Sequence, residues 1–547
     1  MRRRDVWPGS PGRAALTGCA VAVLLALTWT WPALGRGQLL YRDFVQVPDP
    51  VLGPSVLGTD GRAPRAVPLD AVTALLAPVV PSGVQQQVML LASLALAGCG
   101  LAVLLRRRGA AACVVAAAVA VWSPYAAQRL LVGQPPTLLG WAMVPWLVVA
   151  VRRDGSPRRR VLAVLVAALP AALTPFGGLL ALGVVVVTAL ATRHRPGRRR
   201  REPVVLGALG VVWCLPWVVA GLRGATAAGE TSGARAFAVR ADGVQGVLDV
   251  LGGGGIWAPA AALASRAHAP ALVASTLLVL AAATVLVLAP SAPSAPSDSM
   301  RVSPKDGGPH PHDLRVLGAA LVLPTVVALA LASGPGLALW APAQHVPGLG
   351  ILRDTHRLLG LTVLATAVLL GLGVQALRRR LGPVGALGAT ATVLAVAVLG
   401  APDAPARIHQ AYRPTSFPPG WSAAVAVVGD RTTLVLPWQP FRRQAWVGGQ
   451  PFLDPLPLAL RGRVVASRNL TVPRDGGTVV VGSDDTTALR AWARGDLAAL
   501  RDAGVEAVVT WADTPGEALA PPPGARRVET SGPLRVWLVD EPPTVRH

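Results

Sequence analysis

Charged residues are scarce in this sequence of 547 residues. They make up 14% of the chain, whereas soluble globular proteins carry about 25%. Apolar residues reach 52% and the mean hydropathy is +0.50. Several runs approach the roughly 20 apolar residues that cross a bilayer. The scarcity of charge excludes an ordinary soluble domain, and the runs predict an α-helical polytopic membrane protein.

Lysine is almost absent, since Lys305 is the only one and every other basic residue is Arg. The formal net charge of +23 could suggest a nucleic-acid-binding protein. Such a protein carries a basic face on a folded domain, and the sequence shows none. The Arg residues instead form short clusters between apolar runs, which is typical of cytoplasmic loops. The five clusters lie at 2–4, 106–108, 152–160, 193–201 and 378–380. We therefore expect no nucleic-acid partner.

Cysteine is also rare, and the chain has no metal-ligand motif. All four cysteines lie inside apolar runs and form no CxxC pair, so we expect no disulfide framework. The sequence contains neither GxSxG nor HExxH. Four glycines at 252–255 lack the preceding strand and following Gly-Lys-Ser/Thr of a phosphate loop. The residues support no particular cofactor, and a divalent metal is left open.

Eleven apolar runs predict eleven membrane crossings. A cytoplasmic N-terminus places all five Arg clusters inside. We read the first run as an uncleaved helix, because no clear cleavage site follows it. The spans are expected at 13–34, 84–105, 109–123, 137–151, 160–174, 177–192, 203–221, 270–289, 315–333, 357–377 and 383–400.

The run at 161–192 is expected to form two short helices in a hairpin. It has Arg clusters at both ends, so a single crossing would place one cluster outside. The residues at 174–178, Thr-Pro-Phe-Gly-Gly, break the run and favour a turn.

The predicted organisation is a multi-span domain at 1–400 followed by an extracytoplasmic α/β domain at 401–547. The Pro/Ser-rich segment 291–313 is expected to be a cytoplasmic linker. Past residue 400 the charges balance, with 16 Arg against 14 acidic residues. Strands are expected at 432–436, 505–511 and 534–539, with a short helix at 497–504. The large outer loops are expected at 35–83, 222–269 and 334–356.

Two outer loops contain amphipathic stretches. Residues 67–80 are expected to form a helix that lies in the membrane interface. Residues 243–257 show a similar pattern, which ends at the four glycines.

Acidic residues in the membrane half concentrate in the first outer loop. Residues 1–400 hold only 14 Asp and Glu, and four of them lie in this loop. A carboxylate at a membrane edge costs free energy unless it is hydrated or paired. Asp43 lies nearest the first helix and directly follows Arg42, so an ordinary solvated loop acid is the competing interpretation.

Two further outer segments carry polar residues. Residues 349–357 read LGILRDTHR. A helical conformation there would place Arg353 and Arg357 on one face, where two guanidiniums can bind a phosphate. His356 could assist, and an interfacial anchor with an internal Arg–Asp pair is the alternative. Residues 123–137 carry Arg129 and Gln134, either as a polar connector or as the lining of a cavity.

Three short motifs resemble a GT-C-like family of multi-pass proteins from high-GC Gram-positive bacteria. The motifs are Tyr41-Arg42-Asp43, Gln128-Arg129-x-x-x-Gly133-Gln134 and Leu352-Arg353-Asp354. GT-C proteins are membrane glycosyltransferases that use polyprenyl-phosphate-linked sugars, and their first outer loop carries a catalytic Asp, often in an acidic pair. Here Arg42 stands where a second acid would be.

The resemblance implies a role for each candidate residue. Asp43 would be the catalytic base. Arg353 and Arg357, with His356 and Arg129, would bind the donor phosphate. The remaining candidates, Arg42, Asp60, Gln134 and Asp354, would line the substrate cavity. The partners would be membrane lipids, a polyprenyl-phosphate-linked sugar and an envelope glycan, with the protein in the plasma membrane.

Two other classes of function stay open on the sequence. A non-catalytic membrane protein could bind a lipid-linked glycan, which the missing acidic pair favours. A transporter or flippase is less favoured, because no charged residue lies well inside a predicted span and no internal repeat is evident.

The predicted topology can be tested directly. A periplasmic or extracellular reporter fused after residue 400 should be active, and a cytoplasmic reporter at the same place inactive. Active cytoplasmic fusions would reverse the orientation inferred from the Arg clusters.

Overall fold

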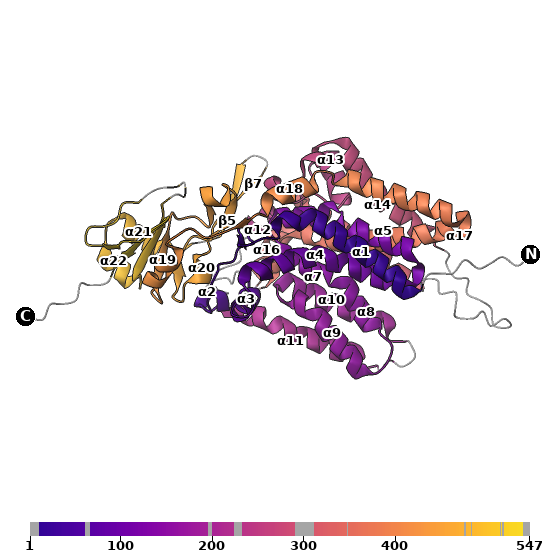
Figure 1. Cartoon of the computed structure of the whole chain (residues 1–547), viewed down its shortest axis with the longest axis horizontal. Coiled ribbons are helices and arrows are strands. Elements are labelled where there is room, and N and C mark those ends of the chain that lie inside the picture. The colour runs from indigo at the N-terminus through magenta and orange to yellow at the C-terminus, as the bar shows by residue number, and fades with distance from the viewer. Residues whose placement is uncertain are drawn as a thin grey trace, which may run out of the picture.

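The computed structural model shows a helical bundle at one end and a smaller region of strands and short helices at the other (Figure 1). It describes residues 10–539 except 61–65, 195–197, 199, 224–231, 290–310, 347, 475–476, 483, 513, 515 and 517–518. The predicted linker at 291–313 lies almost entirely outside the described residues.

The bundle is that of a multi-pass membrane protein. Among the described residues, eight helices are long and apolar enough to cross a membrane. They are Pro11–Ala33, Ser82–Arg108, Ala110–Leu131, Pro175–Thr192, Glu202–Arg223, Ala269–Val287, Asp313–Ala332 and Thr355–Gly400. Their regular helical parts are α1 (Pro11–Thr30), α4 (Ser82–Leu105), α5 (Ala110–Val121), α10 (Pro175–Thr192), α11 (Glu202–Arg223), α14 (Ala269–Val287), α15 (Pro311–Ala332) and α17 (Leu359–Gly400).

Helix α17 folds back on itself and so accounts for two predicted spans. Its 42 residues would extend about 63 Å if straight. Gly382 interrupts the helix with φ 74° and ψ −170°. The Trp122 indole donates to the Ala401 carbonyl at 3.2 Å, while the Tyr125 hydroxyl donates to the Arg357 carbonyl at 3.3 Å. Both ends of α17 therefore lie at the same end of the bundle, as the spans 357–377 and 383–400 require.

The other predicted crossings form shorter helices. Residues 137–151 fall on α7 (Pro135–Ala142) and α8 (Val144–Arg152), and residues 160–174 fall on α9 (Pro157–Ala172). These helices of 8, 9 and 16 residues are each shorter than the roughly 20 residues of a full crossing. The count of eleven crossings therefore stays a prediction.

The run at 161–192 is divided into two helices, as the sequence predicts. Helix α9 ends at Ala172 and α10 begins at Pro175. Thr174 caps α10, because its hydroxyl accepts a hydrogen bond from the Gly177 amide at 3.1 Å.

The segments between the long helices hold short elements. They are β1 (Gln38–Leu39), α2 (Pro54–Leu57), α3 (Leu69–Leu76), α6 (Pro124–Leu131), α12 (Ser232–Ala236), α13 (Gly243–Leu251) and α16 (Gly334–Ala343). Helices α3 and α13 fall on the two predicted amphipathic stretches. Leu75 and Leu76 of α3 are exposed, which suits a helix at the membrane interface.

The C-terminal region, residues 401–539, contains a mixed five-stranded sheet in the order β10-β11-β9-β3-β6. Strand β3 is parallel to β6 and β9, and β11 is antiparallel to β9. The strands are β2 (Pro414–Thr415), β3 (Thr433–Leu436), β4 (Phe441–Arg443), β5 (Pro451–Leu453), β6 (Val464–Val465), β7 (Leu470–Arg474), β8 (Gly477–Val481), β9 (Ala507–Trp511), β10 (Arg526–Val528) and β11 (Leu534–Leu538). The helices are α18 (Ala404–Ala411), α19 (Trp421–Val428), α20 (Leu456–Ala459), α21 (Thr487–Ala493) and α22 (Leu497–Asp502).

The first loop, residues 35–81, is built into the C-terminal region. Strand β1 pairs antiparallel with β2. Leu40, Val45 and Val47 belong to the hydrophobic core that also contains β9 and β11. Since residues at both ends of the sequence form this core, the region that follows residue 400 packs as one unit with the loop that carries Asp43.

Candidate functional site

Asp43 lies at the tip of a tight turn that follows β1. The Tyr41 amide donates to the Phe44 carbonyl at 3.2 Å, and the Phe44 amide donates back at 2.9 Å. Tyr41 and Phe44 are buried, whereas Asp43 is exposed. The buried Tyr41 and Phe44 therefore anchor the turn, and the Asp43 carboxylate points outward from it.

Arg129 and Gln134 come from the connection between α6 and α7. Ser123 caps α6, since its hydroxyl accepts from the Ala126 amide at 3.2 Å. Arg129, near the end of α6, is completely buried, and Gln134 follows the helix in a partly exposed position. The segment thus carries one buried charge and one polar side chain at its surface.

The segment 349–358 is not a continuous helix. It forms two 3₁₀ turns, Leu349–Leu352 and Thr355–Leu358, separated by Arg353 and Asp354. Asp354 has φ −83° and ψ 86°, which breaks the helical path. The helical condition under which Arg353 and Arg357 would share one face is therefore not met.

The two arginines of this segment lie on different aromatic rings. The Arg353 guanidinium is 4.3 Å from the ring centre of Phe237, and the Arg357 guanidinium is 5.4 Å from that of Phe176. The ring contacts fix both side chains by cation–π attraction. Of the two arginines, Arg357 is the one that contacts both Asp354 and Gln134.

Gln134 joins the three segments into one cluster. Its Nε2 donates to Asp43 Oδ2 at 3.4 Å. Its Oε1 accepts from Arg129 Nη1 at 3.0 Å and from Arg357 Nη2 at 3.5 Å. Residues that are more than three hundred positions apart in the sequence therefore surround one amide group.

A buried ion pair lies directly beneath the exposed part of this cluster, inside the helical bundle. Arg129 donates to both carboxylate oxygens of Asp354, at 2.6 and 3.3 Å, and their side chains are 0% and 4% exposed. Arg357 Nε lies 3.3 Å from the same carboxylate. Burial by itself would raise the pKa of Asp354, but the charges of Arg129 and Arg357 outweigh it and lower the pKa to about 2. Asp354 is therefore ionised and faces two guanidiniums.

His356 is not placed to bind a ligand beside Arg357. Its side chain is completely buried, and its ring stacks on Tyr125 at 5.4 Å with an angle of 16°. The 3₁₀ turn directs this side chain into the bundle, whereas the prediction placed it with the phosphate-binding arginines. The packing of Tyr125 and His356 instead supports the backbone of Arg357, whose carbonyl accepts from the Tyr125 hydroxyl.

Arg42 and Asp60 lie in different surroundings within the first loop. Arg42 is partly exposed beside Asp43, and its Nε donates to the Tyr41 hydroxyl at 3.1 Å. Asp60 forms an ion pair with Arg468 at 2.9 Å and accepts from the Ser55 hydroxyl at 3.2 Å. These contacts connect Asp60 with the C-terminal region and give no support to its predicted place in the cavity lining.

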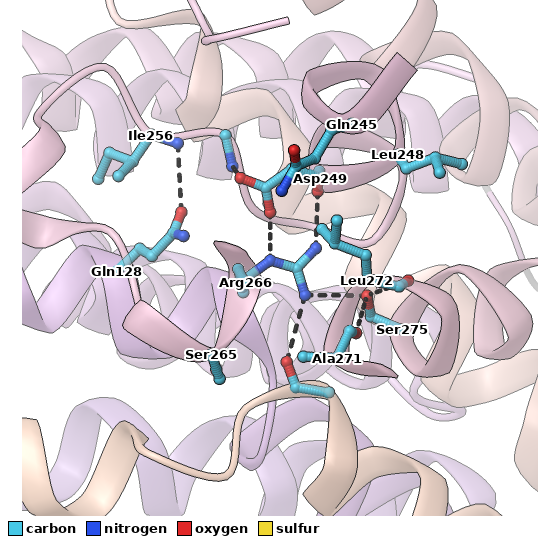
Figure 2. Close-up of polar contacts among 12 residues, drawn as sticks. Gln128, Gln245, Leu248, Asp249, Ile256, Ser265, Arg266, Ala271, Leu272 and Ser275 are labelled. Atoms are coloured by element: carbon cyan, nitrogen blue, oxygen red, sulfur yellow. Dashed lines mark hydrogen bonds and ion pairs between the residues drawn. The ribbon is translucent and has the colours of Figure 1, made fainter. Parts of the chain in front are cut away.

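A second buried network, which the sequence did not indicate, holds the glycine run at 252–255. Figure 2 shows Arg266 paired with Asp249, with further bonds to Ser275. Asp249 also accepts from the Gly255 amide at 2.8 Å. A Cβ at Gly254 would lie 2.1 Å from Asp249 Oδ1, so the run needs glycine to wrap around the ion pair.

This network reaches the candidate site through α6. The Gln128 side-chain oxygen accepts from the Ile256 amide at 3.2 Å (Figure 2). Gln128 directly precedes Arg129, and both side chains are fully buried. The glycine run therefore packs against the helix that carries the buried cation, which is a structural role.

Metal binding finds no support in the side chains of this site. Among the described residues, no three His, Cys, Asp or Glu side chains gather where they could hold a metal ion. Asp43 directly follows Arg42, and its carboxylate accepts a hydrogen bond from the Gln134 side-chain amide.

Comparison with known proteins supports the fold. The chain is similar to the arabinofuranosyltransferase AftD from mycobacteria, with a TM-score of 0.51 and 17% sequence identity over 97% of this chain. It spans 42% of the AftD chain. It is also similar to the Archaeoglobus fulgidus oligosaccharyltransferase, at a TM-score of 0.37 and 12% identity, over 91% of this chain and 67% of that one. The second likeness is too weak to carry an argument.

No family model matches the chain, and no curated protein matches it in sequence. The similarity to a membrane glycosyltransferase is one of fold, and it covers most of this chain.

The ion pair can be tested by removing one partner. Asp354→Asn leaves two guanidiniums without their buried counter-charge, which should cost about 3–5 kcal/mol of stability. Asp154→Asn, at an exposed position, is the matched control and should behave as the wild type. The measurement is thermal unfolding of the purified protein in detergent, and equal melting of both variants would contradict the role of the pair.

The same pair gives a pH dependence. Folding lowers the pKa of Asp354, so the ionised carboxylate stabilises the folded state. This contribution to the free energy of unfolding is complete above about pH 4 and is lost as the pH falls toward about 2. Acid unfolding of the wild type should show this loss between those values, and the Asp354→Asn variant should not.

Proposed function

We propose that this chain is a GT-C-like glycosyltransferase that moves a sugar from a polyprenyl-phosphate donor to a hydroxyl group of an envelope glycan or lipid. The observation that carries the proposal is the meeting of Asp43 and Arg357 on opposite sides of Gln134. Transfer from a lipid phosphate needs a base for the acceptor and a cation for the leaving group. This cluster supplies both at the edge of the helical bundle.

Asp43 is the proposed base. It accepts the proton of the acceptor hydroxyl while the acceptor oxygen forms a bond to the anomeric carbon of the donor. The bond between that carbon and the phosphate oxygen breaks, and the phosphate leaves with its electron pair. An exposed carboxylate on a fixed turn can reach an acceptor that arrives from the aqueous side.

Arg357 is the proposed partner of the leaving phosphate. Its side chain is 19% exposed, whereas that of Arg129 is fully buried, so Arg357 is the more accessible of these two arginines. Asp354 and Phe176 hold it in place. A preorganised cation stabilises the charge that grows on the phosphate without a cost of reorientation. Arg129 acts through Asp354 and Gln134 instead of touching the donor.

The structural similarity suggests which donor sugar to test first. AftD is named as an arabinofuranosyltransferase, so a polyprenyl-phosphate-linked arabinofuranose is the first donor to test. The fold is the only property that the comparison supports, and the sugar belongs to the proposal alone.

A non-catalytic glycan-binding protein is the second candidate. It is favoured by one observation, which is that Arg42 stands next to Asp43 in place of a second acid. The same cluster would then bind a lipid-linked sugar without transferring it.

The role of Asp43 is tested by Asp43→Asn, which keeps the size of the side chain and removes its basicity. We expect at least a 100-fold loss of sugar transfer in isolated membranes, in line with the contribution of about 10²–10⁴ from general bases. Asp49→Asn, an exposed acid of the same loop, is the control and should transfer normally. Full activity of Asp43→Asn would remove the catalytic assignment.

The role of Arg357 is tested by Arg357→Gln with farnesyl phosphate as the binding probe. The variant should bind the probe at least tenfold more weakly, because it loses a charge-assisted contact with phosphate. Arg380→Gln, an exposed cation far along α17, should bind as the wild type does. Unchanged binding by Arg357→Gln would contradict the phosphate contact, and binding without any transfer by the wild type would favour the second candidate.

A further inference from the structure

Arg42 has an unusual backbone conformation. Its φ of 48° is positive, and it is the one non-glycine residue with this property in the described part of the chain. The left-handed conformation costs a residue with a side chain about 1–2 kcal/mol. Such a conformation persists where the surrounding structure enforces it. The contacts of Arg42 show what enforces it.

One side of the turn is held by strand β5 of the C-terminal region. The Arg42 amide donates to the Pro451 carbonyl at 2.7 Å, and the Leu453 amide donates to the Arg42 carbonyl at 2.8 Å. These bonds form a parallel bridge between Arg42 and Phe452. Both backbone polar groups of Arg42 are therefore used by β5.

The β4–β5 hairpin is itself held firmly. Arg442 of β4 forms an ion pair with Asp454, which follows β5, at 2.7 Å, and the two side chains are 0% and 5% exposed. The ring of Phe452 is fully buried and packs against Trp446 and Trp511. Figure 1 shows β5 where the C-terminal strands approach the helical bundle. Because the hairpin is rigid, its hydrogen bonds to Arg42 can hold the turn in one place.

Gly133 also lies directly against the turn. This residue has a φ of +84°, and a Cβ there would lie 2.8 Å from Arg42 Cβ, 2.8 Å from the Asp43 amide nitrogen and 2.9 Å from the Tyr41 carbonyl oxygen. Only glycine lets the α6–α7 connection approach so closely. The next residue is Gln134, which bonds to the Asp43 carboxylate.

We propose that β5 and Gly133 are positioning elements that both contact the Asp43 turn, so that the C-terminal region sets the place of the base. Pro451 and Leu453 fix the backbone of Arg42, and Gly133 sets the distance from the turn to Gln134. A shift of about 1 Å in a reacting group can cost about 100-fold in rate. This inference rests on the proposed role of Asp43.

The first test removes the hydrogen bond from β5. Leu453→Pro deletes the amide that donates to Arg42, whereas Leu453→Ala keeps this amide and trims the side chain. We expect Leu453→Pro to lower the rate of sugar transfer by about 100-fold, with farnesyl phosphate binding within twofold of the wild type. Leu453→Ala should keep the rate within about threefold. Equal rates for the two variants would overturn the role of β5.

The second test removes the close approach at Gly133. Gly133→Ala should lower transfer by a similar factor, because its Cβ must push the turn away from Gln134. Gly504→Ala is the matched control, since Gly504 also has a positive φ, +72°, but no atom within 4 Å of the added Cβ. Normal transfer by Gly133→Ala, or an equal loss in both variants, would overturn the role of Gly133.

A readout other than activity separates positioning from general damage. Hydrogen exchange of the amides at 41–44 should become faster in Leu453→Pro and Gly133→Ala, while the melting temperature of the bundle and probe binding stay near wild type. If faster exchange at 41–44 came together with a lower melting temperature and weaker probe binding, the variants would be misfolded. That outcome would overturn the inference.

The outcome for Asp43→Asn separates this inference from the proposed function. If Asp43→Asn is inactive and the positioning variants are active, the assignment of Asp43 as the base is retained and the positioning inference fails. If Asp43→Asn is fully active, the proposed function fails, and faster exchange at 41–44 would then report only a structural clamp.

Discussion

The ion pair between Arg129 and Asp354 is the interaction on which the candidate site depends. A guanidinium is strongly destabilised in a helical bundle unless a charge and hydrogen bonds compensate it. Asp354 compensates Arg129 with two bonds, and its position requires the break between the two 3₁₀ turns. That break separates Arg353 from Arg357 and turns Arg357 toward Gln134. The arrangement of the accessible charges therefore follows from the need to satisfy a buried one.

The first loop and the C-terminal region depend on each other for their packing. Leu40, Val45 and Val47 fill a core whose other members come mainly from beyond residue 400. Strand β1 has its partner in β2, and Arg42 has its partners in β5. A loop of this kind would not hold one conformation alone, because two residues of strand form too few contacts. The C-terminal region thus gives the loop its order.

Prediction from sequence succeeded where apolar runs and chain breaks decide the structure. The long helices form where uninterrupted apolar residues approach the length of a crossing. Thr174 and Pro175 divide the run at 161–192, as expected from capping and turn preferences. The strands at 433–436, 507–511 and 534–538 match the predicted ones closely. At 349–358 the four-residue spacing of the arginines would place them on one face only in a helix, and the chain instead leaves the helical path at the buried Asp354.

The sequence by itself determined that the chain is a helical membrane protein with a mixed α/β region, because burial in lipid and in a sheet leaves a local pattern of apolar residues. It also singled out Asp43, Arg129, Gln134 and Arg357, because polar residues are rare in the membrane half. Only the tertiary structure decided that Asp43, Arg129 and Arg357 meet at the side-chain amide of Gln134. It also decided that His356 is buried and that Asp60 pairs with Arg468. Such contacts join segments hundreds of residues apart, and no local preference encodes which distant partner a charge will meet.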